Sequence, residues 1–286
     1  MLQYPNQNKI LNNNAKIGFM QGRLSPVING IIQAFPEDNW QNELSIAQTE
    51  GFRIIEWTLD HFNLSNNPFM TKEGQQEIQD LQRKFRIDIP SLTGDCFMQK
   101  PFWKASKNER KNLENEFTDI LKASNKLGVK YIVIPLVDNG SVETASQKSY
   151  LLDYLTTWVE YLVKNQMFVI FESDLNPHLL SKFIEEFSPC FGVNYDIGNS
   201  ASLGFDPTEE IKSYGARIKN IHVKDRKLNG TTISLGDGDA DFKKVFESLK
   251  KINYSGNYIL QTARADNGKH LEALVNYRAF VLDLLE

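Results

Sequence analysis

The feature of this sequence that most constrains its fold is the regular alternation of short apolar runs with longer segments of helical period. Runs of strand length that are rich in β-branched and aromatic residues predict β-strands, and apolar residues three or four apart predict amphipathic helices. We expect strands at residues 17–24, 53–59, 87–92, 131–136, 167–172, 191–196, 218–223 and 258–262. We expect helices at residues 36–50, 71–85, 107–127, 147–165, 177–187, 207–214, 242–251 and 270–285.

This alternation predicts an α/β fold. Parallel strands need helical crossovers, so repeated strand–helix pairs in a chain of 286 residues favour a closed (β/α)8 TIM barrel. We expect a polar N-terminal lead-in at residues 1–15 and a single barrel domain at residues 16–286. A doubly wound open sheet is the alternative, but residues 21–24 (QGRL) lack the glycine-rich phosphate turn that usually follows its first strand.

Composition excludes several classes of protein. The formal net charge is −4, whereas nucleic-acid binding needs a basic surface. Cys96 and Cys190 lie far apart and support neither a disulfide framework nor a thiolate metal site. No apolar run is long enough to span a bilayer, and the Asn- and Gln-rich residues 1–15 lack the apolar core of a signal peptide. We therefore expect a cytoplasmic protein with no nucleic-acid or membrane partner.

Polar residues close the last four expected strands, where a TIM barrel places its chemistry. Two carboxylates, an imidazole and an amide oxygen that converge there form a site suited to Mn²⁺, Mg²⁺ or Co²⁺. Taken singly, each residue also has a structural explanation, as a helix cap, a turn residue, a salt-bridge partner or a hydrogen-bonded rim histidine. The four residues are Glu172, Asp196, His222 and Gln261.

Further charged and polar residues lie at or near the ends of the expected strands, the first three included. Basic side chains at the rim suit substrate oxygens or a phosphate group, although a dense run such as residues 222–226 is also typical of a solvated loop. Glu56 and Lys224 join Glu172 as candidate catalytic residues. The candidate substrate-binding residues are Arg23, Asp95, Asn199, Asp225, Arg226 and Arg264.

The order of these motifs resembles a known family. A strand-end Glu, then the DIGN motif at residues 196–199 and the HVKDR motif at residues 222–226, is similar to the xylose isomerase-like TIM-barrel superfamily. The nearest group is that of the sugar and sugar-phosphate isomerases and epimerases. Residues 18–24 (GFMQGRL) and 235–239 (LGDGD) also resemble that group, so the resemblance extends over about residues 16–286.

The resemblance implies a metal-dependent enzyme. In that family a Glu, an Asp, a His and a second Glu hold one divalent metal, often Mn²⁺, with Mg²⁺, Co²⁺ or Zn²⁺ as alternatives. Carried over, Glu172, Asp196 and His222 are metal ligands here. The implied reaction is isomerisation or epimerisation of a sugar or sugar phosphate through a metal-stabilised enediolate. A homodimer or homotetramer is the implied assembly.

The chain departs from the family pattern at two positions. Gln261 stands where the second Glu is usual, and Asn199 stands where a His is common. Glutamine can offer its carbonyl oxygen to a metal, but it cannot accept a proton. Three outcomes stay open: a one-base shuttle by Glu172, replacement of the missing acid, or a change of function. Replacement candidates are Glu56, Asp95 and Asp225; a change of function would give a dehydratase or lyase on a keto-sugar or inositol-like substrate, or a non-catalytic sugar-binding barrel.

Overall fold

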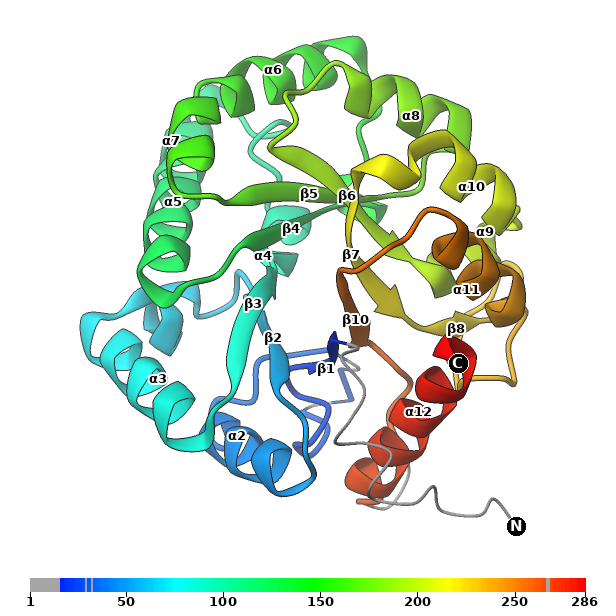
Figure 1. Cartoon of the computed structure of the whole chain (residues 1–286). Helices are drawn as coiled ribbons and strands as arrows, with labels where there is room; N and C mark the ends of the chain where they lie inside the picture. Colours follow the sequence, from blue (N-terminus) through cyan, green and yellow to red (C-terminus); the bar gives the residue numbers. More distant parts are fainter. Residues whose placement is uncertain (1–15, 29, 32, 266–267) are drawn as a thin grey trace.

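A closed barrel of parallel strands forms the centre of the protein, as the strand–helix alternation predicts. The computed structural model describes residues 16–28, 30–31, 33–265 and 268–286, so the expected lead-in at 1–15 lies outside the described residues. Neighbouring strands follow the order β1-β10-β7-β6-β5-β4-β3-β2 around the barrel (Figure 1). Their bounds are β1 Lys16–Met20, β2 Ile54–Thr58, β3 Asp88–Thr93, β4 Tyr131–Leu136, β5 Phe168–Ser173, β6 Phe191–Asp196, β7 Ile218–Val223 and β10 Asn257–Leu260.

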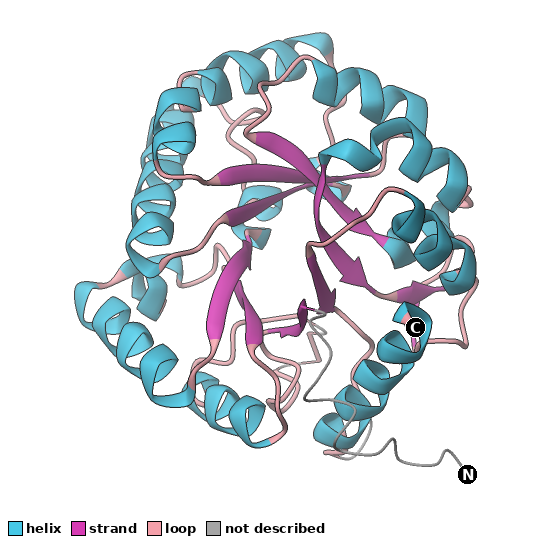
Figure 2. Cartoon of the chain, viewed as in Figure 1, coloured by secondary structure: helices cyan, strands magenta, loops and turns pink. Residues whose placement is uncertain are grey.

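Helices surround the barrel on the outside (Figure 2). The crossover helices begin where local sequence signals place them: the Thr71 side chain accepts a hydrogen bond from the Gly74 amide, and α8 and α10 each start at a proline. The α-helices are α2 Trp40–Thr49, α3 Lys72–Phe85, α4 Asp95–Gln99, α5 Lys107–Leu127, α6 Ala145–Thr156, α7 Val159–Lys164, α8 Pro177–Glu185, α9 Ile197–Leu203, α10 Pro207–Tyr214, α11 Phe242–Lys251 and α12 His270–Leu285.

Shorter elements complete the described chain. Strands β8 Asp225–Arg226 and β9 Thr232–Ile233 form an antiparallel pair beyond the barrel. The 3₁₀ turns are η1 Leu64–Asn66, η2 Pro68–Met70, η3 Asp138–Gly140 and η4 Gly215–Arg217. None of the described helices has the length and apolarity needed to cross a bilayer.

Several expected elements are shorter in the structure: β1 ends at Met20 rather than at residue 24, and α2 begins at Trp40 rather than at residue 36. Two other differences change the number of elements. The single helix expected at 147–165 is two helices, because the amides of Thr157 and Trp158 donate to Tyr154 and Leu155 and so form tighter turns between α6 and α7. Two short helices, α4 and α9, begin directly after β3 and β6, and they are too short to show a helical period in the sequence.

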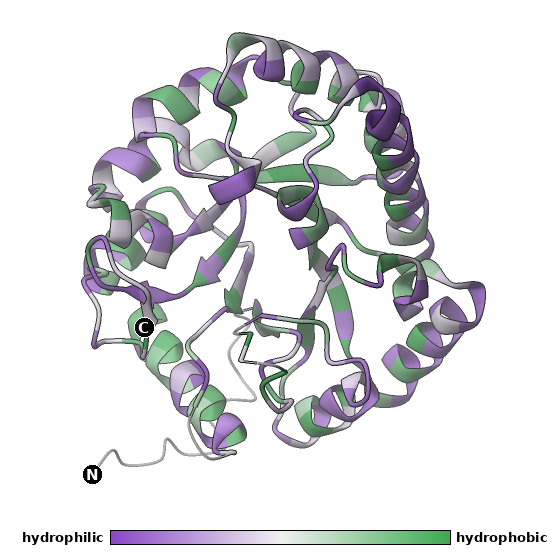
Figure 3. Cartoon of the chain, turned by 180° about the vertical axis from the view of Figure 1, so that it is seen from behind, coloured by the Kyte–Doolittle hydropathy of each residue, from purple (hydrophilic) through white to green (hydrophobic). Residues whose placement is uncertain are grey.

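The outer barrel wall and the inner barrel wall differ in polarity. Outward side chains pack with the helices into one apolar core, and hydrophobic residues are frequent on the strands and the inner faces of the helices (Figure 3). Inside the barrel, Met20, Ile54 and Ile259 form a separate small apolar cluster. The loop aromatics Phe102 and Trp103, which follow α4, are buried in the main core.

Candidate active site

The C-terminal ends of β5, β6 and β7 bring three predicted ligands together. One ligand atom from each of Glu172, Asp196 and His222 lies within 4.8 Å of the other two, and all three residues are buried. His222 Nδ1 is 3.0 Å from Glu172 Oε2 and 3.9 Å from Asp196 Oδ2. Asp196 and His222 are opposite each other in the register of β6 and β7, so the sheet itself sets their separation.

Glu56 of β2 lies on the other side of the His222 ring. Its Oε1 is 2.7 Å from His222 Nε2, and it also accepts hydrogen bonds from Thr93 Oγ1 at 2.6 Å and Asn220 Nδ2 at 2.9 Å. Glu56 is completely buried. This contact fixes the orientation of the imidazole, so that Nδ1 faces Glu172 and Asp196.

Charge in the barrel interior controls the protonation of His222. Burial alone would lower the pKa of His222, but the charge of Glu56 and the hydrogen bonds that the ring donates to Glu172 and Glu56 raise it to about 10. Burial likewise would raise the pKa of Glu56, yet the charge and hydrogen bond of His222 hold it below its usual value. Without a metal, the imidazole is therefore a cation between two carboxylates at neutral pH.

The two rim carboxylates have different environments. For Glu172, the penalty of burial is outweighed by His222, Lys224 and Asn194, and its pKa is lowered. For Asp196, burial and the charge of Glu172 outweigh the nearby cations, and its pKa is raised. Asn194 and Asn199 each donate to one oxygen of Glu172, at 3.0 and 2.6 Å. Glu172 is thus the carboxylate that stays ionised.

Lys224 links the remaining oxygen ligands. Its Nζ donates to Asp196 Oδ2 at 3.1 Å, to Asn199 Oδ1 at 3.1 Å and to Gln261 Oε1 at 3.3 Å. A Cβ atom at Gly198 would come within 2.6 Å of Lys224 Cγ, so glycine at this position leaves room for the lysine stem. The positive charge of Lys224 therefore offsets part of the negative charge of the rim carboxylates. It lies beside Gln261, whose side chain is uncharged.

A second polar chain reaches Gln261 from the mouth of the barrel. Gln261 Nε2 donates to Gln33 Oε1 at 2.9 Å, and Gln33 Nε2 in turn donates to Asp95 Oδ2. Burial, and then the charges of Asp60 and Glu172, raise the pKa of Asp95 to about 7 despite its hydrogen bond from Gln33. The amide orientation of Gln261 follows from this contact, because its nitrogen faces Gln33 and its oxygen faces Lys224.

Two further candidates in the HVKDR motif also hold the polypeptide in place. Asp225 is buried and accepts hydrogen bonds from the amides of Gly236, Gly238 and Ala240, so its carboxylate is used to shape that loop. Arg226 keeps one contact with the rim, from Nη1 to Asn199 Oδ1 at 2.9 Å, and also donates from Nε and Nη2 to the Gly230 carbonyl.

The two arginines expected to bind an anion lie near each other, but both donate hydrogen bonds to backbone carbonyls. Arg23 is buried and donates from Nε to the Thr262 carbonyl at 2.9 Å, while Arg264 donates to the Ser25 carbonyl. Burial first, and then the charge of Arg264, lower the pKa of Arg23 to about 9, and the charges of Glu43 and then Asp95 act in the opposite direction. Arg23 is therefore close enough to Asp95 for their charges to interact.

Three residues of the site were not identified in the sequence. Asn194 and Asn220 lie two residues before Asp196 and His222, so strand alternation directs all four side chains into the barrel. Asn220 donates to Asn194 at 2.8 Å and connects the two inner positions. The alternation of inward and outward side chains along each strand could have identified these asparagines. No pattern in the sequence indicates a role for Gln33.

These donors fit a divalent cation. Glu56 occupies His222 Nε2, so Nδ1 is the ring nitrogen that faces the rim carboxylates, an arrangement typical of metal-binding histidines. Two carboxylates and an imidazole, with an amide oxygen nearby, are ligands that suit Mn²⁺, Mg²⁺ or Co²⁺. Because these residues are buried, a bound cation would also offset the cost of holding two carboxylates out of water.

The protein is an eight-stranded parallel barrel with a polar cluster at the C-terminal ends of its strands. It therefore belongs to the class of TIM-barrel proteins, whose sites lie at those strand ends. The sequence model described as xylose isomerase-like TIM barrel matches residues 44–278, and the chain belongs to this family. The family expected from the motifs is thereby confirmed.

Three similar proteins make the relationship more specific. A Haemophilus influenzae protein named "Putative L-ribulose-5-phosphate 3-epimerase SgbU" is 26% identical over 276 residues, covering 89% of this chain and 94% of its own. L-ribulose-5-phosphate 3-epimerase UlaE of Shigella flexneri is 23% identical over 232 residues, covering 78% and 81%. The crystal structure of a Methylomonas D-allulose 3-epimerase has a TM-score of 0.74 at 14% identity, covering 95% and 98%, and supports the fold. Proteins with these names are isomerases, the enzyme class that the motifs predict.

Proposed function

We propose that this protein is a divalent-metal-dependent 3-epimerase of a ketose phosphate. The observation that carries the proposal is the buried cluster of Glu172, Asp196 and His222 at the strand ends. The names of the curated relatives indicate the substrate class, a ketose 5-phosphate whose C3 configuration is inverted. Glu172, Asp196 and His222 would hold the metal, with the amide oxygen of Gln261 beside them.

The first proton transfer is assigned to Glu172. Its lowered pKa keeps it ionised at neutral pH, as a general base requires. When bound, the metal supplies stabilisation of the negative charge that develops on the substrate oxygens. Asn194 and Asn199 orient the Glu172 carboxylate by their hydrogen bonds, so that it can accept the proton from C3.

The second proton transfer is assigned to Asp95. Inversion at C3 needs a proton donor on the face opposite the base, and Gln261 cannot serve. Of the three replacement candidates, Glu56 lies behind His222, and Asp225 is engaged by three loop amides. Asp95 remains, at the mouth of the barrel, with a pKa of about 7 that suits both loss and gain of a proton.

Basic residues at the rim are assigned to substrate binding. The Lys224 ammonium group lies among Asp196, Asn199 and Gln261, where it would contact a substrate hydroxyl or carbonyl oxygen. Arg226 contacts the same Asn199 from the β8 side and would bind an anionic group outside the metal cluster.

Exchange of the C3 hydrogen tests this function. L-Ribulose 5-phosphate, incubated in D₂O with the protein and Mn²⁺, should gain deuterium at C3 and epimerise, as followed by proton NMR. Glu172→Gln should abolish both, because the amide cannot accept the proton. Glu210→Gln is the matched control: Glu210 is a buried carboxylate that accepts from the Tyr195, Ser200 and Tyr214 hydroxyls and makes no hydrogen bond to Glu172, Asp196 or His222. A panel of ketoses and ketose phosphates that shows no exchange with added Mn²⁺ would overturn the proposal.

A further inference from the structure

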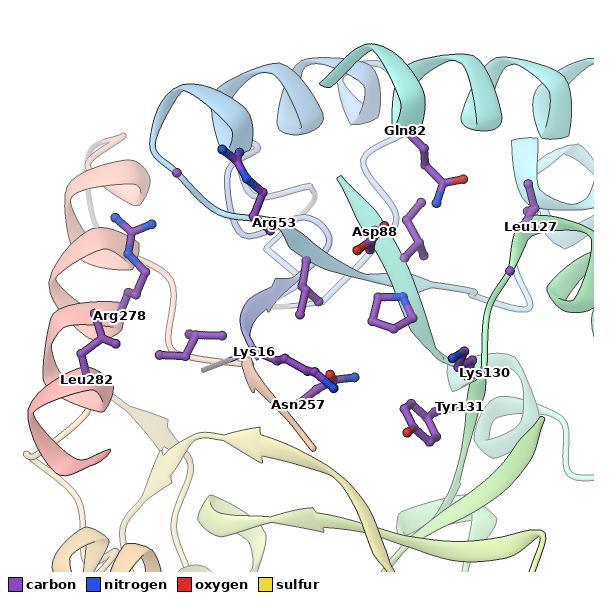
Figure 4. A pocket seen from close by; sticks show the side chains of 16 residues that line it. Lys16, Arg53, Gln82, Asp88, Leu127, Lys130, Tyr131, Asn257, Arg278 and Leu282 are labelled. Carbon is purple, nitrogen blue, oxygen red and sulfur yellow. The ribbon is translucent and has the colours of Figure 1, made fainter. Parts of the chain in front are cut away.

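A cavity lies at the opposite end of the barrel from the rim cluster. Its volume is about 660 Å³, within the range of small-molecule sites. The first residues of several strands line it, among them Lys16 of β1, Asp88 of β3 and Asn257 of β10, together with residues of α12 (Figure 4). A TIM barrel places catalysis at the C-terminal ends of its strands, so this cavity has no part in the proposed epimerisation.

The walls of this basal cavity are strongly cationic. Four basic residues line it, Lys16, Arg53, Lys130 and Arg278, and among the described residues Asp88 is the only acidic one that lines it. In the part of the chain that the structure describes, none of these five side chains makes an ion pair within 4.0 Å. Residues 1–15 contain Lys9 and no Asp or Glu.

Two buried donors in the same wall have no hydrogen-bond partner within the described residues. Asn257 is 3% exposed, and its Nδ2 makes no hydrogen bond. Arg278 is 5% exposed; its Nη1 donates to the Glu50 carbonyl and its guanidinium lies over the Phe52 ring, but its Nε has no partner. Buried donors are nearly always satisfied, by protein or by bound groups, so an acceptor is expected in this cavity.

The cations lie on different parts of the cavity wall. Lys16 and Asn257 are opposite each other in the β1–β10 register and lie in the centre of the cavity, with Lys130 on one side. Arg53 and Arg278 lie on the other side, and their guanidinium groups point away from the centre (Figure 4). With Asp88 included, the five charged side chains carry a net charge of +3 (four positive, one negative).

We propose that this basal cavity binds a phosphorylated small molecule through Lys16, Lys130 and Asn257, independently of the rim site. Phosphoryl oxygens accept several charge-assisted hydrogen bonds at once, which matches a cavity that offers ammonium, guanidinium and amide donors. The volume exceeds that of a bare phosphate and accommodates a sugar phosphate or a nucleotide. Ligand binding at this end would stabilise the strand starts of the folded barrel.

Titration calorimetry with inorganic pyrophosphate as the probe tests this proposal on the full chain. Citrate at equal ionic strength distinguishes phosphoryl recognition from attraction of any polyanion. The variant Lys16→Gln/Lys130→Gln removes two exposed cations of the cavity. The distant variant Lys107→Gln/Lys182→Gln removes the same charge from exposed positions that do not line the cavity, on the outer helices α5 and α8. Asn257→Ala removes an uncharged donor.

The proposal expects pyrophosphate binding that weakens about tenfold or more per lost cation in the cavity variant. The distant variant should bind as the wild type does, and Asn257→Ala should bind about two- to tenfold more weakly. Exchange of the C3 hydrogen at the rim should be unchanged in all three variants. A failure of the proposed epimerase activity can therefore be distinguished from a failure of pyrophosphate binding in the basal cavity. Absence of pyrophosphate binding, equal binding of citrate, or equal losses in the cavity and distant variants would overturn the proposal.

Discussion

Replacing Glu56 by Gln should alter the protein in a way that depends on pH. The substitution keeps the shape of a buried side chain that contacts His222, Thr93 and Asn220, but removes its charge. In the metal-free protein, His222 then loses the largest of the influences that raise its pKa to about 10. The pKa of His222 should therefore fall, and the protonated imidazole should contribute less to the free energy of unfolding.

The size of this effect follows from linkage. The folded-state pKa of His222 is raised from 6.5 to about 10, so its contribution to stability is complete below pH 6.5 and is lost as the pH rises towards 10. Between roughly pH 7 and pH 9.5, this single group accounts for about 3 kcal/mol of lost unfolding free energy. Glu56→Gln should remove most of that slope and lower the stability at neutral pH.

Guanidinium unfolding with EDTA, at roughly pH 7 and pH 9.5, measures this slope for each variant. Asp225→Asn is the matched control: Asp225 is also fully buried and accepts three hydrogen bonds, from the amides of Gly236, Gly238 and Ala240, but does not contact His222. Its slope should equal that of the wild type. If Glu56→Gln also keeps the wild-type slope, the assignment of Glu56 as the partner of His222 is wrong.

Three other predictions concern the rim. Gln261→Glu should bind Mn²⁺ about tenfold or more tightly by calorimetry, because it adds an anionic ligand; unchanged affinity would place residue 261 outside the metal site. Asp95→Asn should lower epimerisation by about 100-fold or more while C3 exchange persists, since Glu172 still removes the proton; loss of both to the same extent would contradict the assignment. Mn²⁺ affinity of the wild type should rise as the pH increases towards 10, because metal binding displaces a proton from His222, and a flat profile would argue against this ligand.

The sequence predicts the architecture because its local signals agree with one another. The expected strands 191–196 and 218–223 and the expected helices 107–127 and 207–214 coincide with the observed elements. Each is either a short apolar run or a periodic segment with a clear end signal, such as Gly128 in the left-handed region after α5. Short helices such as α4 carry no period and therefore escape detection.

The sequence also locates the rim cluster, because strand ends at one edge of a barrel must converge. It does not give the partners that decide what each residue does. Glu56 and His222 are 166 residues apart and meet across the barrel, so no local pattern reveals that the carboxylate lies behind the ring. The bridge from Gln261 through Gln33 to Asp95 is equally non-local. Roles within the site therefore follow from tertiary contacts.

The most direct test of the central claim is an anomalous difference map from a crystal of the protein soaked in Mn²⁺. We expect one strong peak at the C-terminal rim, within bonding distance of Glu172, Asp196 and His222 Nδ1. A soak in which the manganese lies elsewhere, or in which the Lys224 ammonium still occupies the space between Asp196 and Gln261 with no metal beside it, would contradict the account.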